Sequence, residues 1–255
     1  MRFEKWEALG NAYLLVEQPQ AGSLAPERVR LLCDVRAGIG SDGVLEITSR
    51  DGTRASVVIW NPDGSTAETS GNGLRIAAAW LARESGSGAV TLESAGRPHP
   101  AELVGPGVVE IELGAVAVGA EERVEVDGES LVLTPVSVGN PHAVVRRELL
   151  QRDELLRLGP ALERHRRFPQ RTNVQLVHPS GPHAVDALVW ERGAGETTAS
   201  GSSAVAVAAC AVARGWCGSP VTVRLPGGAL TVRLAGDLAT LVGPVAFVAA
   251  GETDL

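Results

Sequence analysis

Residues 193–209, GAGETTASGSSAVAVAA, are the stretch from which the fold can be worked out. A glycine-broken loop leads into Ser200-Gly201-Ser202, and a run of alanine and valine follows. Residues 61–82, NPDGSTAETSGNGLRIAAAWLA, repeat this arrangement with Ser70-Gly71-Asn72-Gly73 before an apolar run. Because serine is among the preferred N-cap residues, each stretch predicts a helix that begins at a Ser-Gly turn.

The two predicted helices are unusually apolar. Residues 204–213 carry apolar side chains all round, and the first run has a broad apolar face that includes Leu74 and Trp80. A helix without a polar face must be buried on every side, so each is expected inside a curled sheet. Gly86 and Gly215 predict where the helices end.

The rest of the chain is mainly strand-like. Alternation of apolar and polar residues predicts half-buried strands at 43–48, 55–60, 108–113, 131–136, 173–177, 221–225 and 230–234. Amphipathic patterns predict helices at 25–34 and 152–165. Both halves offer strands, a glycine turn, a central helix and a return hairpin, in that order. We therefore predict an α+β fold of two pseudo-repeated domains, residues 1–118 and 119–255, each a curled, mostly antiparallel sheet around a central helix, with a ligand cleft between them.

Composition narrows the partners and the location. The net charge is −7 and the sequence pI about 5.3, which argues against nucleic acid as a partner. The N-terminus carries charges throughout, unlike a signal peptide, and no apolar run approaches the ~20 residues of a membrane span. Cys33, Cys210 and Cys217 are odd in number and lack metal-ligand spacing. A cytoplasmic protein without a membrane partner, disulfide or metal site is expected.

The paired helix starts suggest an anionic ligand. The first N–H groups of a helix lack partners within the helix, and together with the helix dipole they attract a carboxylate. Two such starts facing one cleft favour a small carboxylate, such as an amino acid. The plain alternative is that Ser70 and Ser200 only cap their helices.

Eight segments, taken in order, resemble the diaminopimelate epimerase family of cofactor-independent amino-acid racemases. They are ALGNAYLLVE, GIGSDGVL, NPDGSTAETSGNGLR, VSVGNPHAVV, FPQRTNVQLV, WERGAGETTASGSSA, LPGGAL and LVGPV. The resemblance covers nearly the whole chain. It implies two like domains and an isomerase of lysine biosynthesis that removes the α-proton from one face of an amino acid and returns a proton to the other. It also implies that no pyridoxal or other cofactor takes part, and it is compatible with a homodimer.

The chain departs from the family at the two acid/base positions, because Ser70 and Ser200 stand where the family has cysteines. A thiol with a pKa near ~8.5 can be made a thiolate by a helix N-terminus. A serine hydroxyl stays protonated unless a neighbouring base activates it. The expectation is a rate lower by several powers of ten.

Four interpretations follow from this departure. In the first, the serines disable an otherwise ordinary epimerase. In the second, a single acid, Glu68, Glu191 or Glu196, shuttles the proton in a changed reaction, as in the related phenazine-pathway isomerases. In the third, the chain binds an amino acid without catalysis. A structural or interaction protein on the same fold is the fourth, and it predicts no stabilisation by any charged amino acid.

The resemblance also implies a set of site residues. Catalytic candidates are Ser70, Ser200, His142 and Glu191. Arg192 is expected to hold a distal carboxylate and Glu191 a distal ammonium, since a guanidinium can grip a carboxylate through two hydrogen bonds. The substrate-binding candidates are Asn11, Asn61, Gly71, Asn72, Asn140, Asn173, Glu191, Arg192, Gly201 and Ser202. Asn61-Pro62-Asp63-Gly64 and Gly139-Asn140-Pro141 also suit ordinary turns.

Overall fold

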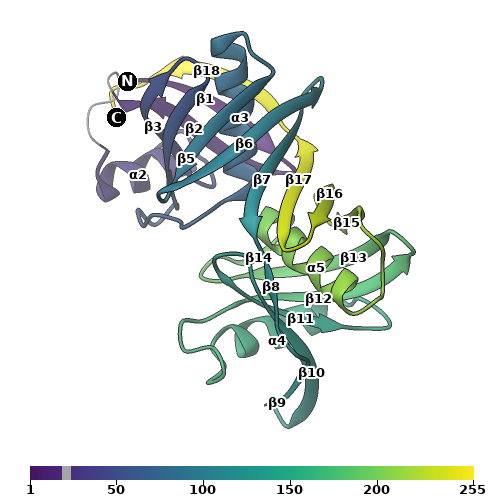
Figure 1. Cartoon of the computed structure of the whole chain (residues 1–255). Helices are drawn as coiled ribbons and strands as arrows, with labels where there is room; N and C mark the ends of the chain where they lie inside the picture. The colour runs from purple at the N-terminus through teal and green to yellow at the C-terminus, as the bar shows by residue number, and fades with distance from the viewer. Residues whose placement is uncertain (19–23) are drawn as a thin grey trace. The chain divides into compact units, whose positions relative to one another are not determined.

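The computed structural model describes residues 1–18 and 24–255, and the chain divides into two compact units (Figure 1). The first unit contains residues 1–112 and 242–255, and the second contains residues 113–241. The predicted division at residue 118 therefore differs from the observed division in two ways. The chain enters the second unit earlier, and its C-terminal segment returns to the first unit, where the last strand pairs with the first.

The first unit is a sheet built around one helix. Its strands are β1 (Arg2–Ala8), β2 (Asn11–Glu17), β3 (Val44–Asp51), β4 (Arg54–Trp60), β5 (Ala89–Ser94), β6 (Arg97–Gly105), β7 (Val108–Ala115) and β18 (Ala246–Glu252). They pair in the order β18-β1-β2-β3-β4-β5-β6-β7, and only β2–β3 and β4–β5 are parallel. Its helices are α2 (Pro26–Cys33) and α3 (Gly71–Ser85).

The second unit repeats this plan. Its strands are β8 (Ala117–Val118), β9 (Glu122–Val126), β10 (Glu129–Ser137), β11 (Pro141–Arg146), β12 (Asn173–Gly181), β13 (Ala184–Glu191), β14 (Gly195–Thr197), β15 (Val221–Leu225) and β16 (Gly228–Ala235), and β17 (Leu238–Pro244) leads back to the first unit. Its helices are α4 (Arg152–Glu163) and α5 (Gly201–Ala213). Strands β10-β11-β12-β13-β15-β16 pair in that order, with only β11–β12 and β13–β15 parallel.

The alternation of antiparallel and parallel pairs is thus the same in β1–β6 as in β10–β16. The helices also fall at matching places, because α2 and α4 connect the first parallel pair of each unit, while α3 and α5 connect the second. The predicted pseudo-repeat of mixed α and β structure is confirmed at the level of topology. All seven predicted strands and all four predicted helices are present, with ends that differ by a few residues.

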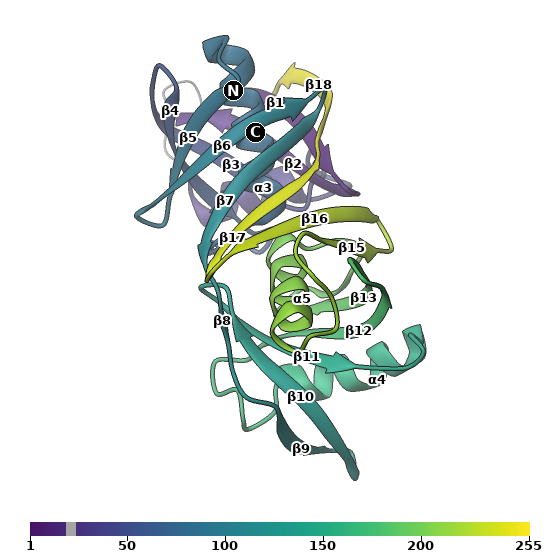
Figure 2. The ribbon, with the colours of Figure 1, turned by 45° about the vertical axis from the view of Figure 1, so that its right-hand side comes forward.

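The two central helices are buried as their composition predicts. Every residue of α3 from Gly71 to Ala82 is buried, as is every residue of α5 from Gly201 to Ala211. Helix α3 packs against β1, β2, β4, β5 and β6, and α5 packs against β8, β10–β13, β15 and β16 (Figure 2). Burying one Leu, Ile or Val side chain contributes about 2 kcal/mol, so these packed faces hold each sheet in its curl.

The helix ends agree with the glycine signals. Gly86 ends α3 with φ of 70°, and Gly215 follows the end of α5 with φ of 67°. Both angles lie in the left-handed region that glycine adopts at little cost. None of the helices in residues 1–18 and 24–255 combines the length and apolarity needed to cross a membrane.

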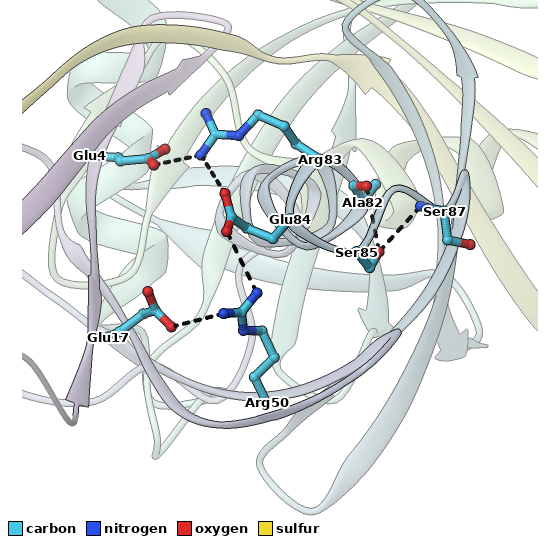
Figure 3. Close-up of polar contacts among 8 residues, drawn as sticks. All are labelled: Glu4, Glu17, Arg50, Ala82, Arg83, Glu84, Ser85 and Ser87. Carbon is cyan, nitrogen blue, oxygen red and sulfur yellow. Dashed lines mark hydrogen bonds and ion pairs between the residues drawn. The ribbon is translucent and has the colours of Figure 1, made fainter.

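A charged network surrounds the C-terminal end of α3 (Figure 3). Arg83 contacts Glu4 and Glu84, and Glu84 also lies 3.6 Å from Arg50, which reaches Glu17 at 3.8 Å. The network joins the helix end to β1, β2 and β3. These side chains are partly exposed, and ion pairs near the surface contribute at most about 1 kcal/mol each, so the network fixes the helix end more than it stabilises the unit.

Candidate active site

The site candidates fall into two groups, one at the start of each buried helix. In the first unit, Ser70 is the N-cap of α3, with φ of −142°. Its Oγ accepts a hydrogen bond from the backbone N–H of Gly73 at 3.0 Å. The capping role predicted for Ser70 is therefore confirmed. The next backbone N–H, of Leu74, bonds to the Ser70 carbonyl and begins the regular helix.

Tyr13 joins this group, although sequence reasoning did not select it. Its phenol oxygen lies 3.0 Å from Ser70 Oγ. The signal that could have found it is internal: Gly10-Asn11-Ala12-Tyr13 and Gly139-Asn140-Pro141-His142 open equivalent strands, and both glycines have φ of 85°. Tyr13 thus stands in the first unit where His142 stands in the second.

A buried cation completes the start of α3. The guanidinium of Arg75 donates to the Gly71 carbonyl at 3.0 Å and to Asn72 Oδ1 at 2.9 Å. No carboxylate in the described part of the chain forms an ion pair with it, and its Nε has no hydrogen-bond partner. Burial lowers the pKa of Arg75 to about 10, which still leaves it charged at neutral pH, and the electrostatic interaction with Tyr13 acts against this lowering.

The two remaining candidates of the first unit lie at strand ends. Asn11 begins β2 immediately after the Leu9-Gly10 turn. Asn61 follows β4, donates from Nδ2 to Ser65 Oγ at 3.0 Å, and closes a turn through its carbonyl to the N–H of Gly64. The turn predicted at residues 61–64 is confirmed.

In the second unit, Ser200 occupies the N-cap position of α5 but its side chain does not cap the helix. Instead its Oγ donates a hydrogen bond to Glu191 Oε2 at 2.8 Å. The interpretation of Ser200 as a simple cap is therefore wrong, because its side chain accepts no hydrogen bond from the first N–H groups of the helix. Burial raises the pKa of Glu191, and the hydrogen bond from Ser200 opposes this.

His142 lies close to this group but is locked as a neutral ring. Gln175 Nε2 donates to Nδ1 at 3.0 Å, so the proton sits on Nε2, which lies 2.8 Å from Asn140 Oδ1. Burial, followed by the positive charge of Arg192, lowers the pKa of His142 to about 3. A ring this weakly basic is poorly suited to accept a proton at neutral pH, and its contacts suit the positioning of Asn140.

The amides of the second unit hold its loops together. Asn173 donates from Nδ2 to the Pro141 carbonyl at 3.0 Å and accepts from the backbone N–H of Arg192 at 3.0 Å. Both ends of this amide are thus in use within the protein. Arg192 is partly exposed, and one of its guanidinium nitrogens lies 3.4 Å from the Gln170 carbonyl.

Among the three acids that could shuttle a proton alone, Glu191 forms a hydrogen bond with a helix-start serine, Ser200. Glu196 is exposed and forms a two-pronged ion pair with Arg152, at 2.8 and 2.7 Å. Glu68 is exposed in the loop before α3. Cys210 is a core residue of α5, since it is fully buried and burial raises its thiol pKa to about 11.

The structure therefore gathers the candidates by unit. Ser70, Gly71 and Asn72 lie together at the start of α3, and Ser200, Gly201 and Ser202 lie together at the start of α5. The two serines occupy equivalent positions but face different partners, a phenol for Ser70 and a carboxylate for Ser200.

Comparison with known proteins gives a consistent result. A family model described as diaminopimelate epimerase matches residues 3–118 and 134–248. The diaminopimelate epimerase of Alkalilimnicola ehrlichii is 36% identical, and the match covers 100% of this chain and 99% of that protein. The diaminopimelate epimerase of Xylella fastidiosa is 37% identical over 97% of this chain and 94% of that protein.

Solved structures are similar in fold at much lower identity. A hydroxyproline epimerase from Agrobacterium vitis, with bound trans-4-hydroxy-L-proline, has a TM-score of 0.79 at 15% identity and covers 98% of this chain and 90% of its own. A phenazine biosynthesis protein from Bacillus anthracis has a TM-score of 0.73 at 14% identity, covering 100% and 99%. These neighbours confirm the predicted fold class.

Proposed function

This chain belongs to the diaminopimelate epimerase family, and on that premise we propose that it is an isomerase that inverts an amino acid at Cα without a cofactor. The substrate class is an amino acid with a second charged end, because the relatives carry the name of such a substrate and Arg192 offers a partly exposed guanidinium for a distal carboxylate. Diaminopimelate is the first substrate to test.

The observation that carries the proposal is the hydrogen bond from Ser200 Oγ to Glu191 Oε2, 2.8 Å long, at the start of α5. Because the Ser200 hydroxyl directs its proton to the carboxylate, the lone pairs of its oxygen are left to accept a proton from the substrate. Ser200 can then take the α-proton while its own proton passes to Glu191, which becomes a neutral acid. The raised pKa of Glu191 makes this carboxylate a better base than an ordinary glutamate.

The helix starts supply the second requirement, stabilisation of charge on the α-carboxylate. Gly201 and Ser202 precede the first intrahelical hydrogen bond of α5, between the N–H of Ala204 and the Ser200 carbonyl. Gly71 and Asn72 hold the same place in α3. Backbone N–H groups at such positions stabilise negative charge that grows as the proton leaves.

Serine makes the reaction slower than a thiol would. The hydroxyl is a weaker acid than a thiol by several pKa units, so the relay through Glu191 has a lower driving force than direct transfer to a thiolate. We expect replacement of both serines by cysteine, Ser70→Cys with Ser200→Cys, to raise the inversion rate by about 100-fold or more.

The direct test is deuterium uptake at Cα in D₂O, followed by NMR with separate analysis of the stereoisomers. The substrates are diaminopimelate and simple amino acids. Glu191→Gln should lower exchange by about 100-fold or more, because the amide cannot accept the serine proton. Glu196→Gln is the matched control, because it neutralises a nearby carboxylate that pairs only on the surface with Arg152.

The pH dependence of the exchange rate also tests the role of Glu191. Glu191 must be ionised to accept a proton, so exchange should rise with pH through its pKa. Because burial raises that pKa, the rise should lie above the range of an ordinary glutamate, near ~4.3. The same rise should vanish in Glu191→Gln.

Two results would contradict the proposal. Saturable binding of diaminopimelate without any exchange would favour an amino-acid-binding homologue. Equal exchange in Glu191→Gln and the unmodified protein would remove Glu191 from the reaction.

A further inference from the structure

The proposed inversion needs a second group that returns a proton to Cα, and the inference that follows rests on that proposed function. Ser70 is the helix-start serine of the first unit, yet a lone serine is a very weak acid. Its neighbour is Tyr13, the single tyrosine of the chain, whose oxygen lies 3.0 Å from Ser70 Oγ. A phenol, with an ordinary pKa of about 10, is a far stronger acid than an alcohol.

The fold makes room for this ring at Gly43. A Cβ added at residue 43 would lie 2.7 Å from Tyr13 Cε1 and 2.5 Å from the Trp60 carbonyl oxygen. The strand that carries Tyr13 is held at the same place, because Asp42 accepts from the Ala12 N–H at 2.7 Å and the Gly43 carbonyl accepts from the Leu14 N–H at 3.1 Å. The position of the phenol is therefore built into the sheet.

A buried charge, that of Arg75, interacts electrostatically with Tyr13. Arg75 is fully buried, one of its nitrogens is unpartnered, and none of the described carboxylates neutralises it. A buried cation without a counterion is costly. The free-energy cost of burying the Arg75 cation is lower while a negative charge is present nearby, as it is on Tyr13 after the loss of its proton.

The hydrogen bonds also fit a donor role for Ser70. Its Oγ already accepts the N–H of Gly73 at 3.0 Å. When Tyr13 donates as well, both lone pairs of the oxygen are occupied, and the Ser70 proton is left to point elsewhere. Ser200 is the reverse case, since its proton is directed to Glu191 and its lone pairs are left to accept.

We propose that Tyr13 is the proton partner of Ser70, acting through that hydroxyl rather than by touching the substrate. In one direction of inversion, Ser200 takes the α-proton and passes its own to Glu191. Ser70, when it protonates the carbanion at Cα, receives the proton of Tyr13. The products are the inverted amino acid, protonated Glu191 and a phenolate beside Arg75. The reverse reaction starts from that state, and exchange with water resets it.

The first experiment compares exchange and inversion in Tyr13→Phe, with folding checked by thermal unfolding. The ring stays in place, and only the hydroxyl is lost. Inversion should fall by about 100-fold or more, whereas exchange without inversion should persist, because the Glu191–Ser200 side is untouched. Inversion by the unmodified protein should also decline at high pH as the phenol ionises, and this decline should be absent from the residual activity of Tyr13→Phe.

The second experiment follows the phenol itself. Labelling tyrosine with ¹³C at Cζ gives one NMR signal, because the chain has one tyrosine. Arg75→Met should raise the midpoint of its pH titration by about one unit or more, since a nearby cation favours the phenolate. Arg83→Met is the matched control: it removes a cation from the other end of the same helix and should leave the midpoint unchanged.

The outcomes separate this inference from the proposed function. Exchange and inversion at unmodified rates in Tyr13→Phe would overturn the role of Tyr13 and leave the epimerase proposal standing. Absence of exchange in the unmodified protein would overturn both. The inference would also be rejected by two results together. The titration midpoint of Tyr13 would be the same in Arg75→Met as in the unmodified protein, and the decline of inversion at high pH would persist in Tyr13→Phe, which would assign that decline to another group.

Discussion

His142 shows what a buried residue in a site can and cannot do. The ring has no exposed surface, and hydrogen bonds from Gln175 and to Asn140 fix its neutral form. Protonation would place a charge in a buried site close to Arg192, which is why its pKa falls to about 3. The imidazole therefore acts as a fixed link between β12 and the Asn140 loop.

This neutral histidine predicts a loss of stability in acid. The folded protein keeps His142 neutral down to about pH 3, whereas the unfolded chain binds a proton below about pH 6.5. The stabilisation is thus complete above pH 6.5 and is lost as the pH falls towards 3. By pH 4 the loss should be about 3 kcal/mol, measured by denaturant unfolding at several pH values.

His142→Asn should flatten this part of the pH profile, whatever its effect on stability at pH 7. His183→Asn is the control, because His183 is exposed. An unchanged slope in His142→Asn would show that other groups cause the acid sensitivity.

At this scale the sequence predicted where the helix-start serines lie but not how each hydroxyl is used. Ser70 and Ser200 share the local pattern Ser-Gly before an apolar run, so local reasoning gives them one role. The partner of Ser200 lies on β13, nine residues before it, whereas the partner of Ser70 lies on β2, far away in sequence, where local reasoning does not reach. Tyr13 was missed for the same reason, since 57 residues separate it from Ser70.

Among the elements, the two central helices were the most predictable because composition alone demands their burial. The strands that sequence reasoning missed include β11, whose residues 142–145 are all buried, and β18, whose residues are mostly exposed. Neither has the period-two alternation by which strands are recognised. Ala143 and Val145 pack in one cluster with α4, and β11 also packs against α5, so both faces of the strand are covered and its alternation is lost.

The C-terminal end of α3 offers a matched pair of glycines for a stability test. Gly86 has φ of 70°, whereas Gly88 lies outside the left-handed region, and an added Cβ at either position meets nothing within 4 Å. Gly86→Ala should therefore lower the free energy of unfolding by about 1 kcal/mol through backbone strain alone. Gly88→Ala should be neutral or slightly stabilising.

Denaturant unfolding of the two variants measures the difference. Equal effects would mean that the left-handed turn contributes nothing to the helix end. A larger loss in Gly88→Ala would contradict the assigned backbone geometry.

At the scale of the whole molecule, the order of parallel and antiparallel pairs is used twice, and the sequence predicted this repeat from its paired helix starts. The sequence did not predict the path of the C-terminus. Strand β18 pairs with β1 from Arg2 to Glu7, and the N-terminal ammonium bonds to the Thr253 carbonyl at 2.6 Å. A pairing across some 250 residues leaves no local trace in either segment.

The return of the C-terminus predicts a local effect of truncation. A chain that stops at Val245 lacks β18, so the β1 amides that face it lose their partners. Hydrogen exchange measured by mass spectrometry should be about tenfold or more faster in β1, while β12 and α5 of the second unit keep their protection. A chain that stops at Glu252 is the control, since it retains β18. Uniform loss of protection in both units would contradict the division into two units.

The contact between Gly43 and the Tyr13 ring also constrains how this sequence can drift. Any side chain gained at position 43 must displace either the ring or the Trp60 carbonyl. Positions 13 and 43 can therefore change only together. A lineage that gains a larger side chain at position 43 must have a smaller or reoriented side chain at position 13. The residue found at position 43 of a homologue thus foretells whether an aromatic ring can stand beside its helix-start residue.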